Sequence, residues 1–360
     1  MAQTYAVPGL TPQQWDDNFF RNYVRASRFK RYMGTDENSM IQLKDDLTKK
    51  RGDSVTFALV NELAGVGVTG NQTLKGNEER VNSRSHKLTV GVIRHAVSVD
   101  DWDVQKSVID LRKAGEVQLK QWAQTKLRND ILNALGQIDG VNYTSASAAQ
   151  LNTWTTNNQD RVLFGASRAN FNATHATALA TIDNTNDRLT PSSLTLMKRM
   201  AQNSSPKIKP ITLSAMDQEW FVVFVGSRSW RNLNEDNPTS NQIVLANRET
   251  RVRGEDNPLF TGDSLIWNGL IIRELPEIVP ITTSTINIEP VYMCGAQAVG
   301  VAWAQRTKST TDTDDYDFLH GIGVQEMRVI EKLRFGTGAT DLLVPKDNGI
   351  VTGFFAAVAD

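Results

Sequence analysis

The most informative segment of this chain spans residues 52–97 and reads GDSVTFALVNELAGVGVTGNQTLKGNEERVNSRSHKLTVGVIRHAV. Apolar and polar residues alternate over 54–60 and again over 87–97. Because successive side chains of a strand point to opposite faces, both runs are predicted to be strands that pair antiparallel. Residues 61–86 between them are mostly glycine and polar residues, so the segment predicts a hairpin with an unusually long tip.

Such a tip cannot bury itself. Holding roughly 20 residues in one conformation costs on the order of 20 to 40 kcal/mol of backbone entropy. Offsetting that cost would require burying roughly 800 to 1,600 Å² of apolar surface, which its few apolar side chains cannot supply. The regular strands at its base argue against a floppy loop, although that alternative stays open. We therefore expect the tip to lie on a neighbouring subunit.

A very long helix is expected after the hairpin, over residues 101–135. Asp100 suits the N-cap, Asp101 and Asp103 place negative charge in the first turn, and Gly136 suits termination. A helix of about 35 residues spans about 50 Å. Its apolar residues drift from one side to the other, which argues against a coiled coil. The pattern indicates a helix that contacts different elements at its two ends.

The N-terminal region is predicted to contain a helix from a capping box at Thr11 toward residue 33. Arg21, Arg25 and Arg28 line one side of it. This arginine stripe is either a solvated face or a surface that lies along packaged DNA.

The remaining chain predicts a mixed α+β fold without regular βαβ alternation. Residues 137–188 are rich in Asn, Thr, Ala and Ser, and are expected to form exposed loops with a short helix near 146–153. A further helix is predicted over 191–203, where Pro191 follows Thr190. The strand candidates lie at 220–225, 264–273, 285–293, 298–304 and 326–333.

Composition limits the functional classes. A chain of 360 residues predicts one elaborated domain or two interlocked ones. Its 39 basic and 40 acidic residues nearly cancel, which argues against a protein that grips a nucleic-acid backbone. Neither a signal peptide nor an apolar run of membrane-spanning length is recognisable, so a soluble protein made in the cytosol, without a membrane partner, is expected. The single cysteine, Cys294, is expected to be a buried small apolar residue.

Motifs for catalysis or cofactor binding are incomplete. Gly65, Gly67 and Gly70 match half of a dinucleotide-binding fingerprint, but no helical pattern or acidic residue follows at the required distance. A turn that needs positive φ, or a close backbone approach to another subunit, explains these glycines better. His86 and His95 are expected to be structural, on opposite faces of one strand. Four acidic residues form a cluster that favours a solvated turn over a calcium site: Asp312, Asp314, Asp315 and Asp317. No catalytic, cofactor-binding or metal-binding residue is nominated.

Eight short sequence blocks stand in an order that resembles the major capsid proteins of tailed bacteriophages. The resemblance is in particular to the coat proteins of podoviruses with a virion-packaged RNA polymerase. The blocks are GDSVTF at 52–57, GVGVTG at 65–70, GNEE at 76–79, IRHAV at 93–97, NPLFTG at 257–262, NG at 268–269, GAQAVGVAW at 295–303 and HGIGV at 320–324. The resemblance covers most of the chain and fades over 137–188, which we expect to be a variable insertion.

This resemblance implies a capsid protein fold with four parts. They are an N-terminal arm over residues 1–50, an extended β-hairpin loop over 51–99, a peripheral domain over 100–207 with the spine helix at 101–135, and an axial domain over 208–284. Residues 285–360 are expected to supply return strands of the peripheral domain and the C-terminus.

The function that the resemblance implies is structural, with no enzyme activity and no cofactor. The subunit is expected to form hexamers and pentamers of an icosahedral head around double-stranded DNA, contacted non-specifically at most. Further expected partners are a separate scaffolding protein, a portal and decoration proteins; synthesis is expected in the host cytoplasm and final location in the virion. Candidate inter-subunit residues are Gly65, Gly67, Gly70, Glu78, Glu79, Arg80 and Arg94, the charged ones being equally compatible with a solvated role. The alternatives are a bacterial nanocompartment shell protein, a nucleotide-binding enzyme, or a phage tail or fibre component.

Overall fold

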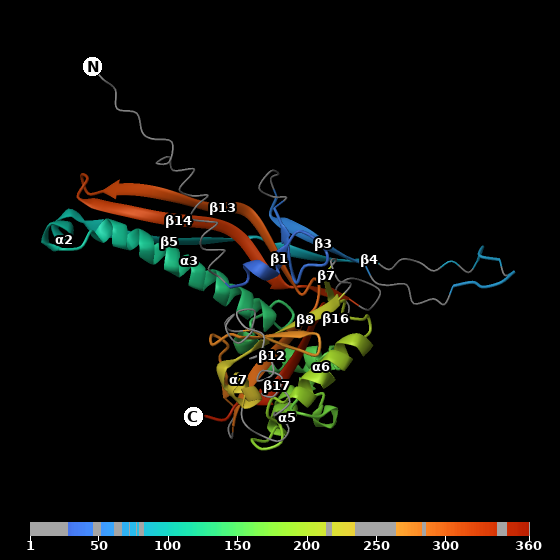
Figure 1. The fold of residues 1–360 in the computed structure, drawn as a ribbon. Helices are drawn as coiled ribbons and strands as arrows, with labels where there is room; N and C mark the ends of the chain where they lie inside the picture. The colour runs from blue at the N-terminus through green and yellow to red at the C-terminus, as the bar shows by residue number, and fades with distance from the viewer. Residues whose placement is uncertain are drawn as a thin grey trace, which may run out of the picture. The chain divides into compact units, whose positions relative to one another are not determined.

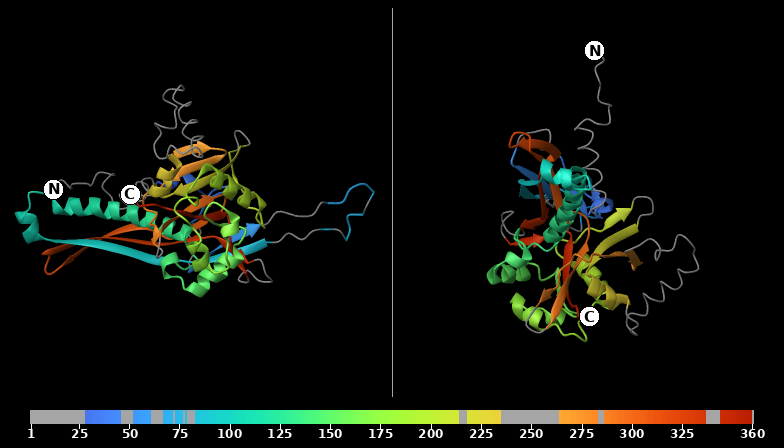
Figure 2. Two further views of the ribbon diagram at one scale, coloured as in Figure 1. Left: turned by 90° about the horizontal axis from the view of Figure 1, so that it is seen from below. Right: turned by 90° about the vertical axis from the view of Figure 1, so that its left-hand side faces the viewer.

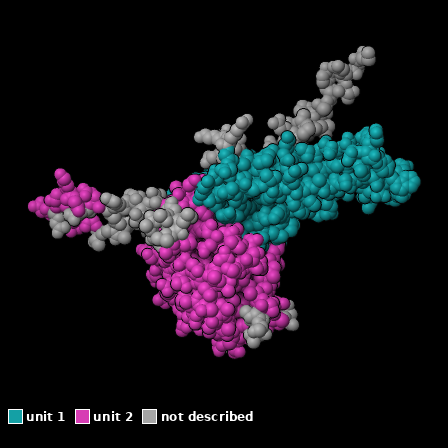
Figure 3. All heavy atoms as spheres, turned by 180° about the vertical axis from the view of Figure 1, so that it is seen from behind, with its two compact units in different colours: residues 1–55, 87–134, 299–331 teal, residues 56–86, 135–298, 332–360 magenta. Residues whose placement is uncertain are grey.

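The fold is that of a computed structural model, which describes residues 28–45, 52–60, 67–71, 73–76, 78, 83–213, 218–234, 264–282, 286–336 and 344–359. Helices and strands are mixed along the chain (Figure 1). The chain divides into two compact units, coloured separately in Figure 3. Unit 1 comprises residues 1–55, 87–134 and 299–331, and unit 2 comprises residues 56–86, 135–298 and 332–360. Most of the predicted N-terminal helix lies outside the described residues; residues Lys30–Tyr32 form a single 3₁₀ turn, η1.

Unit 1 is built on a five-stranded sheet with the order β1-β2-β13-β14-β5. The strands are β1 (Met33–Gly34), β2 (Ile41–Lys44), β5 (Gly91–Asp100), β13 (Val299–Asp314) and β14 (Leu319–Lys332). β2 pairs in parallel with β1 and β13, whereas β14 pairs antiparallel with β5 from Leu319 opposite Asp100 to Arg328 opposite Gly91. The strands predicted at 298–304 and 326–333 are thus confirmed, within much longer strands.

The predicted helix over 101–135 is interrupted, which corrects the expectation of one continuous helix. The structure has α2 (Asp101–Lys106) and α3 (Leu111–Leu135), and α3 lies along the sheet (Figure 2). The predicted N-cap is confirmed, because Asp100 accepts a hydrogen bond of 2.7 Å from the Asp103 amide. Local side-chain bonds explain the break: Ser107 Oγ accepts from the Ile109 amide at 3.1 Å, and Asp110 Oδ1 from the Lys113 amide at 3.1 Å. Ser and Asp compete for backbone donors in this way and so start a new helix.

The hairpin pairs β3 (Ser54–Val60) with β4 (Ser83–Thr89). The first strand is confirmed, but the predicted partner over 87–97 is wrong in part. The chain leaves β4 at Val90, whose amide donates to the Asp53 carbonyl at 2.9 Å, and then continues as β5 in the sheet of unit 1. His86 and His95 therefore belong to different strands.

Unit 2 is built on a mixed sheet whose main path is β6-β17-β12-β8-β10-β9. The strands are β6 (Val162–Phe164), β8 (Gln218–Val225), β9 (Ser264–Trp267), β10 (Leu270–Glu274), β12 (Asn287–Cys294) and β17 (Ile350–Ala356), with β7 (Ile211–Leu213) on β8 and β11 (Ile281–Thr282) on β12. The predicted buried strand at 220–225 and the strand at 285–293 are confirmed by β8 and β12. The predicted strand at 264–273 is a hairpin instead, because Asn268 and Gly269 adopt positive φ between β9 and β10.

Helix α6 (Pro191–Asn203) confirms the prediction made from Thr190 and Pro191. Thr190 and Ser193 form a reciprocal capping box, and Pro191 stands in the first turn. The helix buries Leu194, Met197 and Ala201 in the same apolar cluster as β8 and β10. The other elements of unit 2 are η3 (Tyr143–Ser145), α4 (Ala148–Asn157), η4 (Arg168–Asn170), α5 (His175–Ala180), α7 (Ser227–Asn234), and the pair β15 (Arg334–Gly336) and β16 (Pro345–Asp347).

Residues 137–188 are not the exposed loops that their composition predicts. They contain α4, α5 and β6 and contribute the larger part of a second apolar cluster. Its buried members are Ile138, Trp154, Val162, Phe164, Ala178, Leu179, Ile182, Ile288, Phe354 and Ala356. In the sequence these apolar residues stand far apart among small polar ones. Their burial is therefore not indicated by a helical or strand periodicity.

Candidate inter-subunit surfaces

The base of the hairpin is firmly anchored. Val55, Phe57 and Leu59 alternate along β3 and are at most 5% exposed, and Leu88 of β4 is fully buried. This confirms the period-two pattern that identified the strand. The side chains at the base of the hairpin are therefore packed.

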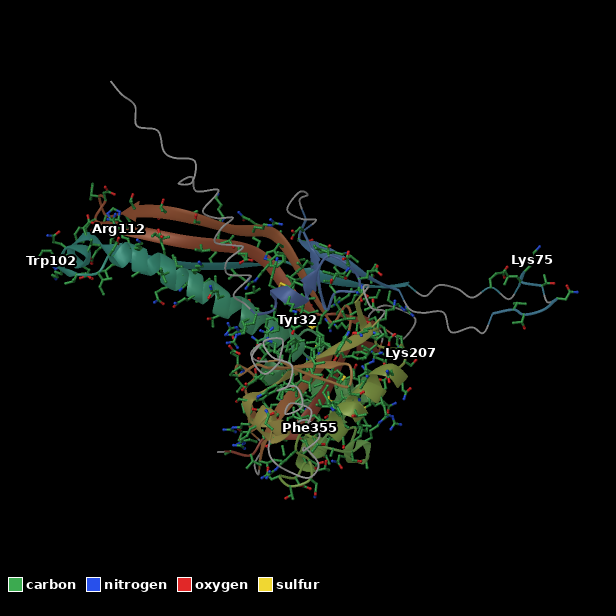
Figure 4. The ribbon with its side chains drawn as sticks, in the orientation of Figure 1. Tyr32, Lys75, Trp102, Arg112, Lys207 and Phe355 are labelled. Atoms are coloured by element: carbon green, nitrogen blue, oxygen red, sulfur yellow. The ribbon has the colours of Figure 1, made fainter. Side chains whose placement is uncertain are left out.

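The tip of the hairpin, which here means the described residues among 67–78, is exposed throughout except for the half-buried Val68. Gly67, Gly70 and Gly76 adopt φ of +72°, +71° and +93°, and a Cβ at any of them would meet no atom within 4 Å. Leu74 is 63% exposed. Within the tip, the Gly76 amide donates a hydrogen bond of 2.7 Å to Glu78 Oε2. Figure 4 marks Lys75 in this segment.

The candidate interface residues are placed as follows. Gly67, Gly70 and Glu78 lie in the tip, and the positive φ of both glycines matches the turn that was predicted. Arg94 is exposed in the middle of β5, opposite Gln325 of β14. Within the described residues no ion pair joins Glu78 to Arg94. Arg28 is exposed, with φ of +69°. Gly65, Glu79, Arg80, Arg21 and Arg25 lie outside the described residues.

The sheet of unit 1 presents one covered and one open face along β5. His95 packs against Trp122 of α3 with ring centroids 4.5 Å apart, and a Cβ at Gly115 of α3 would lie 3.4 Å from Val97. The alternate residues of β5 point to the other face and are exposed: Val92, Arg94, Ala96 and Ser98. Helix α3 thus covers one side of β5, whereas the described side chains on the opposite side of this strand are exposed.

Buried charges lock α3 to this sheet. Arg328 of β14 donates to Asp130 of α3 at 2.8 Å and lies 3.3 Å from Glu326. Trp303 of β13 donates its indole N–H to Glu326 at 2.5 Å. Because Arg328 and Glu326 are only 4% and 6% exposed, each depends on the other for compensation of its charge.

A surface at the end of unit 1, which sequence analysis did not single out, carries exposed large apolar side chains. We call it the distal surface and define it by Trp102 of α2, Val108 and Ile109 in the break before α3, and Tyr316 and Phe318 in the turn between β13 and β14. The four clustered aspartates, Asp312, Asp314, Asp315 and Asp317, are exposed beside it, as expected for a solvated turn. Val108 and Ile109 fall within the range predicted as one continuous helix, and the capping residues Ser107 and Asp110 are the sequence signal for the break that exposes them.

The ionisable residues buried in unit 2 are engaged in structural bonds. His175 has Tyr143 Oη at 2.8 Å from Nε2 and Thr155 Oγ1 at 2.9 Å from Nδ1, and burial lowers its pKa to about 4. Burial and the nearby Arg334 likewise lower the pKa of His86 to about 4. Cys294 is fully buried, as predicted, and burial raises the pKa of its thiol well above the usual range.

A buried polar network joins distant segments of unit 2. Asp347 Oδ2 accepts hydrogen bonds from Lys332 Nζ at 2.8 Å and from Trp154 Nε1 at 3.0 Å. Arg161 donates to the backbone carbonyls of Asp347 and Pro206. The Asp347 carboxylate is thus held by a buried ammonium group and an indole N–H.

Comparison with known proteins identifies the family of this chain. The family model described as phage capsid protein matches residues 7–358. The chain belongs to this family of phage capsid proteins. Within it the chain is a major capsid protein, a structural subunit of an icosahedral phage capsid.

The relatives that match this chain over nearly its whole length are capsid proteins. The major capsid protein of Pseudomonas phage KPP25 is 26% identical, over 97% of this chain and 96% of that protein. The capsid subunit of cyanophage Pam1 is 32% identical and superposes with a TM-score of 0.80, over all of both chains. The capsid protein of Ralstonia phage GP4 has the same fold, with a TM-score of 0.71 at 20% identity, over 92% of this chain and 91% of that one. These relatives confirm the predicted capsid fold and do not favour the nanocompartment alternative.

Proposed function

We propose that this subunit assembles into hexamers and pentamers whose hairpin tips lie on adjacent copies, and that these capsomers close the head around double-stranded DNA. The observation that carries the proposal is the contrast between the buried base of the hairpin and its exposed tip. Burial of apolar surface on an adjacent copy would offset the entropy cost of ordering such an exposed, polar tip. The subunit of the cyanophage Pam1 capsid resembles this chain over its full length, which supports assembly into a shell.

The four-part organisation is proposed with the boundaries of the family. The N-terminal arm comprises residues 1–50, the extended loop 51–99, the peripheral domain 100–207 together with 285–360, and the axial domain 208–284. After residue 100 the compact units favour two changes. They divide at residues 134 and 135, at the end of α3, so residues 135–207 would accompany the axial region and α3 would close the peripheral part of the chain. Residues 285–298 and 332–360 also group with unit 2, so residues 299–331 alone would supply the return strands of the peripheral domain.

The subunit is further proposed to act without catalysis and without a cofactor. This proposal is supported by the burial of His86, His175 and Cys294, whose pKa values are shifted because their side chains lie away from solvent. Among the helices that the structure describes, none is long and apolar enough to cross a membrane.

The partners proposed beyond the shell itself are a separate scaffolding protein, a portal, and decoration proteins. Contact with packaged DNA is proposed to be non-specific, through Arg21, Arg25 and Arg28, since the chain carries no net positive charge. Synthesis in the host cytoplasm followed by incorporation into the virion completes the proposal.

Deletion of residues 67–78 tests the hairpin role directly. The deletion removes the exposed tip and retains β3 and β4, so the subunit should stay folded and soluble. Electron microscopy and sedimentation should show closed shells for the wild type and none for the deletion variant. Leu74→Ser, which removes the largest apolar side chain of the tip at full loop length, is the matched control and should weaken assembly without abolishing it. Normal shells from the deletion variant would contradict the proposal.

A further inference from the structure

One guanidinium group connects the base of the hairpin to two other segments of unit 2. Arg334 of β15 donates its Nε–H to His86 Nε2 of β4 at 3.3 Å. Arg334 Nη1 also lies 3.7 Å from Asp139 Oδ1, in the turn that follows α3. His86 is 8% exposed, so this end of the contact lies in the interior. The contact joins residues 248 positions apart in sequence and holds β4 against β15.

This contact requires a neutral imidazole in one tautomer. A guanidinium group only donates hydrogen bonds, so His86 Nε2 must present its lone pair to Arg334, and the proton of the neutral ring lies on Nδ1. Nδ1 is buried and has no hydrogen-bond partner in the part of the chain that the structure describes. A second proton would have to go to Nε2, where it would face a cation. Protonation of His86 and its contact with Arg334 therefore exclude each other.

The groups around His86 disfavour its charged form. Burial and the cation of Arg334 lower its pKa to about 4. Arg84, a second basic residue, stands two positions away on the same face of β4. The buried residues of the paired strand β3 are apolar: Val55, Phe57 and Leu59. Burial raises the pKa of Asp139, the anionic partner of Arg334, so acid neutralises this carboxylate as well and weakens the contact from its other side.

The place of this contact in the chain suits a role in directing the hairpin. The chain passes between the two compact units at residues 86 and 87 and again at residues 331 and 332. His86 stands at the first of these crossings, and Arg334 follows shortly after the second. A local opening at this point would free the hairpin where it leaves unit 2.

We infer that Arg334 is a positioning residue that holds the base of the hairpin, and that its contact with His86 is a latch that opens in acid. The inference rests on the proposed function, in which this hairpin reaches an adjacent copy. Neutral His86 keeps β3 and β4 on unit 2. Protonated His86 releases them before the unit as a whole unfolds.

Hydrogen exchange of dissociated subunits, with labelling times scaled to the intrinsic exchange rate at each pH, tests the latch. Between pH 7 and pH 5 the amides of β3 and β4 should lose at least about tenfold in protection, because the open state binds a proton that the closed state does not. Strand β17 should remain more protected than β3 and β4 at both pH values, since the opening is local. Equal protection of β17 and the hairpin base would indicate global unfolding and overturn the latch.

His86→Gln is the decisive variant. Its side-chain carbonyl can accept the hydrogen bond from Arg334 but does not titrate, so the protection of β3 and β4 should be nearly equal at pH 7 and pH 5. His175→Gln, the same change at the other buried histidine of lowered pKa, is the matched control and should keep the wild-type loss. A wild-type loss in His86→Gln would contradict the latch.

Arg334→Leu tests the positioning role at neutral pH. The variant lacks both the donor and the cation, so β3 and β4 should show at pH 7 the low protection that the wild type shows in acid. Unchanged protection would mean that Arg334 does not hold the hairpin.

The outcomes separate this inference from the proposed function, because the exchange measurements do not require shells. If deletion of residues 67–78 leaves shells normal, the proposed role of the tip fails whatever the exchange data show. If the acid dependence persists in His86→Gln, the latch fails and the proposed function stands.

Discussion

At the scale of single residues, the interior of unit 2 contains neutral histidines and buried charges in hydrogen bonds. His175 is 2% exposed and contacts Tyr143, Trp154, Phe164 and Phe354 with its ring. A protonated imidazole in that aromatic setting would lose most of its hydration. Such residues make the fold sensitive to acid.

Acidification is expected to destabilise the protein between pH 6.5 and pH 4. Above pH 6.5 the imidazoles of His175 and His86 are neutral in both folded and unfolded chains and contribute no pH dependence. Below pH 6.5 the unfolded chain binds protons that the folded chain, with pKa values of about 4, does not. The free energy of unfolding should therefore fall as pH drops, by roughly 3 kcal/mol for each histidine once pH 4 is reached.

Denaturant unfolding of the dissociated subunit at pH 7.5, 6 and 5 measures this effect. His175→Gln removes one titrating group and should show a shallower decline across this range than the wild type, whatever its stability at pH 7.5. Equal declines in the two proteins would exclude His175 as a source of the acid sensitivity.

At the scale of elements, the junction of α3 with its sheet is the central feature of unit 1. Its polar part is the Arg328, Glu326 and Asp130 network, and its apolar part includes Trp122 against His95. Along α3 the residues Leu119, Ala123, Leu127, Ile131 and Leu135 are buried at four-residue spacing, so the buried charges add to a continuous apolar stripe.

Arg328→Met is expected to lower the free energy of unfolding by about 3 to 5 kcal/mol, because it leaves Glu326 buried without its cation. The double variant Glu326→Gln/Arg328→Met should recover part of that loss. Thermal and denaturant unfolding followed by circular dichroism provides the measurement.

Lys126→Met is the matched control for this network. Lys126 pairs with Asp130 at 2.7 Å one turn along α3, but its side chain is 42% exposed, so the change should stay within about 0.5 kcal/mol. A loss as large as that of Arg328→Met would show that burial is not the deciding factor.

At the scale of the whole molecule, the packed interiors of the two units differ from the exposed hairpin tip and distal surface in how their side chains are buried. The two apolar clusters of unit 2 and the α3 junction of unit 1 are satisfied within one chain. The hairpin tip and the distal surface are not. The proposed function assigns the exposed hairpin tip to contacts between copies of the chain.

Hydrogen exchange should distinguish the free subunit from the assembled one at the hairpin tip. Amides of the described tip residues should exchange rapidly in dissociated subunits, because their side chains find no packing there, and should become protected in shells. Strand β17 (Ile350–Ala356), buried in unit 2, should be protected in both states and serves as the internal reference. A tip that is already protected in dissociated subunits would place it on its own chain.

Much of the local structure followed from sequence patterns. The alternation at Val55, Phe57 and Leu59, the Asp100 cap and the Thr190–Pro191 start are short-range signals, since each depends on residues within one or two turns. The sequence blocks that resemble phage major capsid proteins predicted the capsid fold. The glycines of the tip were correctly explained by positive φ at Gly67 and Gly70.

Other features depend on contacts between residues far apart in sequence. The choice of β4 as the partner of β3, the burial of Trp154 and Phe164 within 137–188, and the pairing of Arg328 with Asp130 all join segments that no local pattern relates. At 107–110 the side chains of Ser107 and Asp110 accept hydrogen bonds from backbone amides and so interrupt the helix. The helical pattern of the surrounding sequence does not show this break.

The amino-acid sequence by itself therefore determined where strands and helices begin, that the hairpin tip lacks the means to bury itself, and which family the chain resembles. The tertiary structure alone decided which strands pair, which polar residues are buried as partners, and which apolar side chains remain in solvent at the distal surface. The physical reason is range: capping and periodicity act over a few residues, whereas burial depends on the three-dimensional approach of segments separated by tens to hundreds of residues.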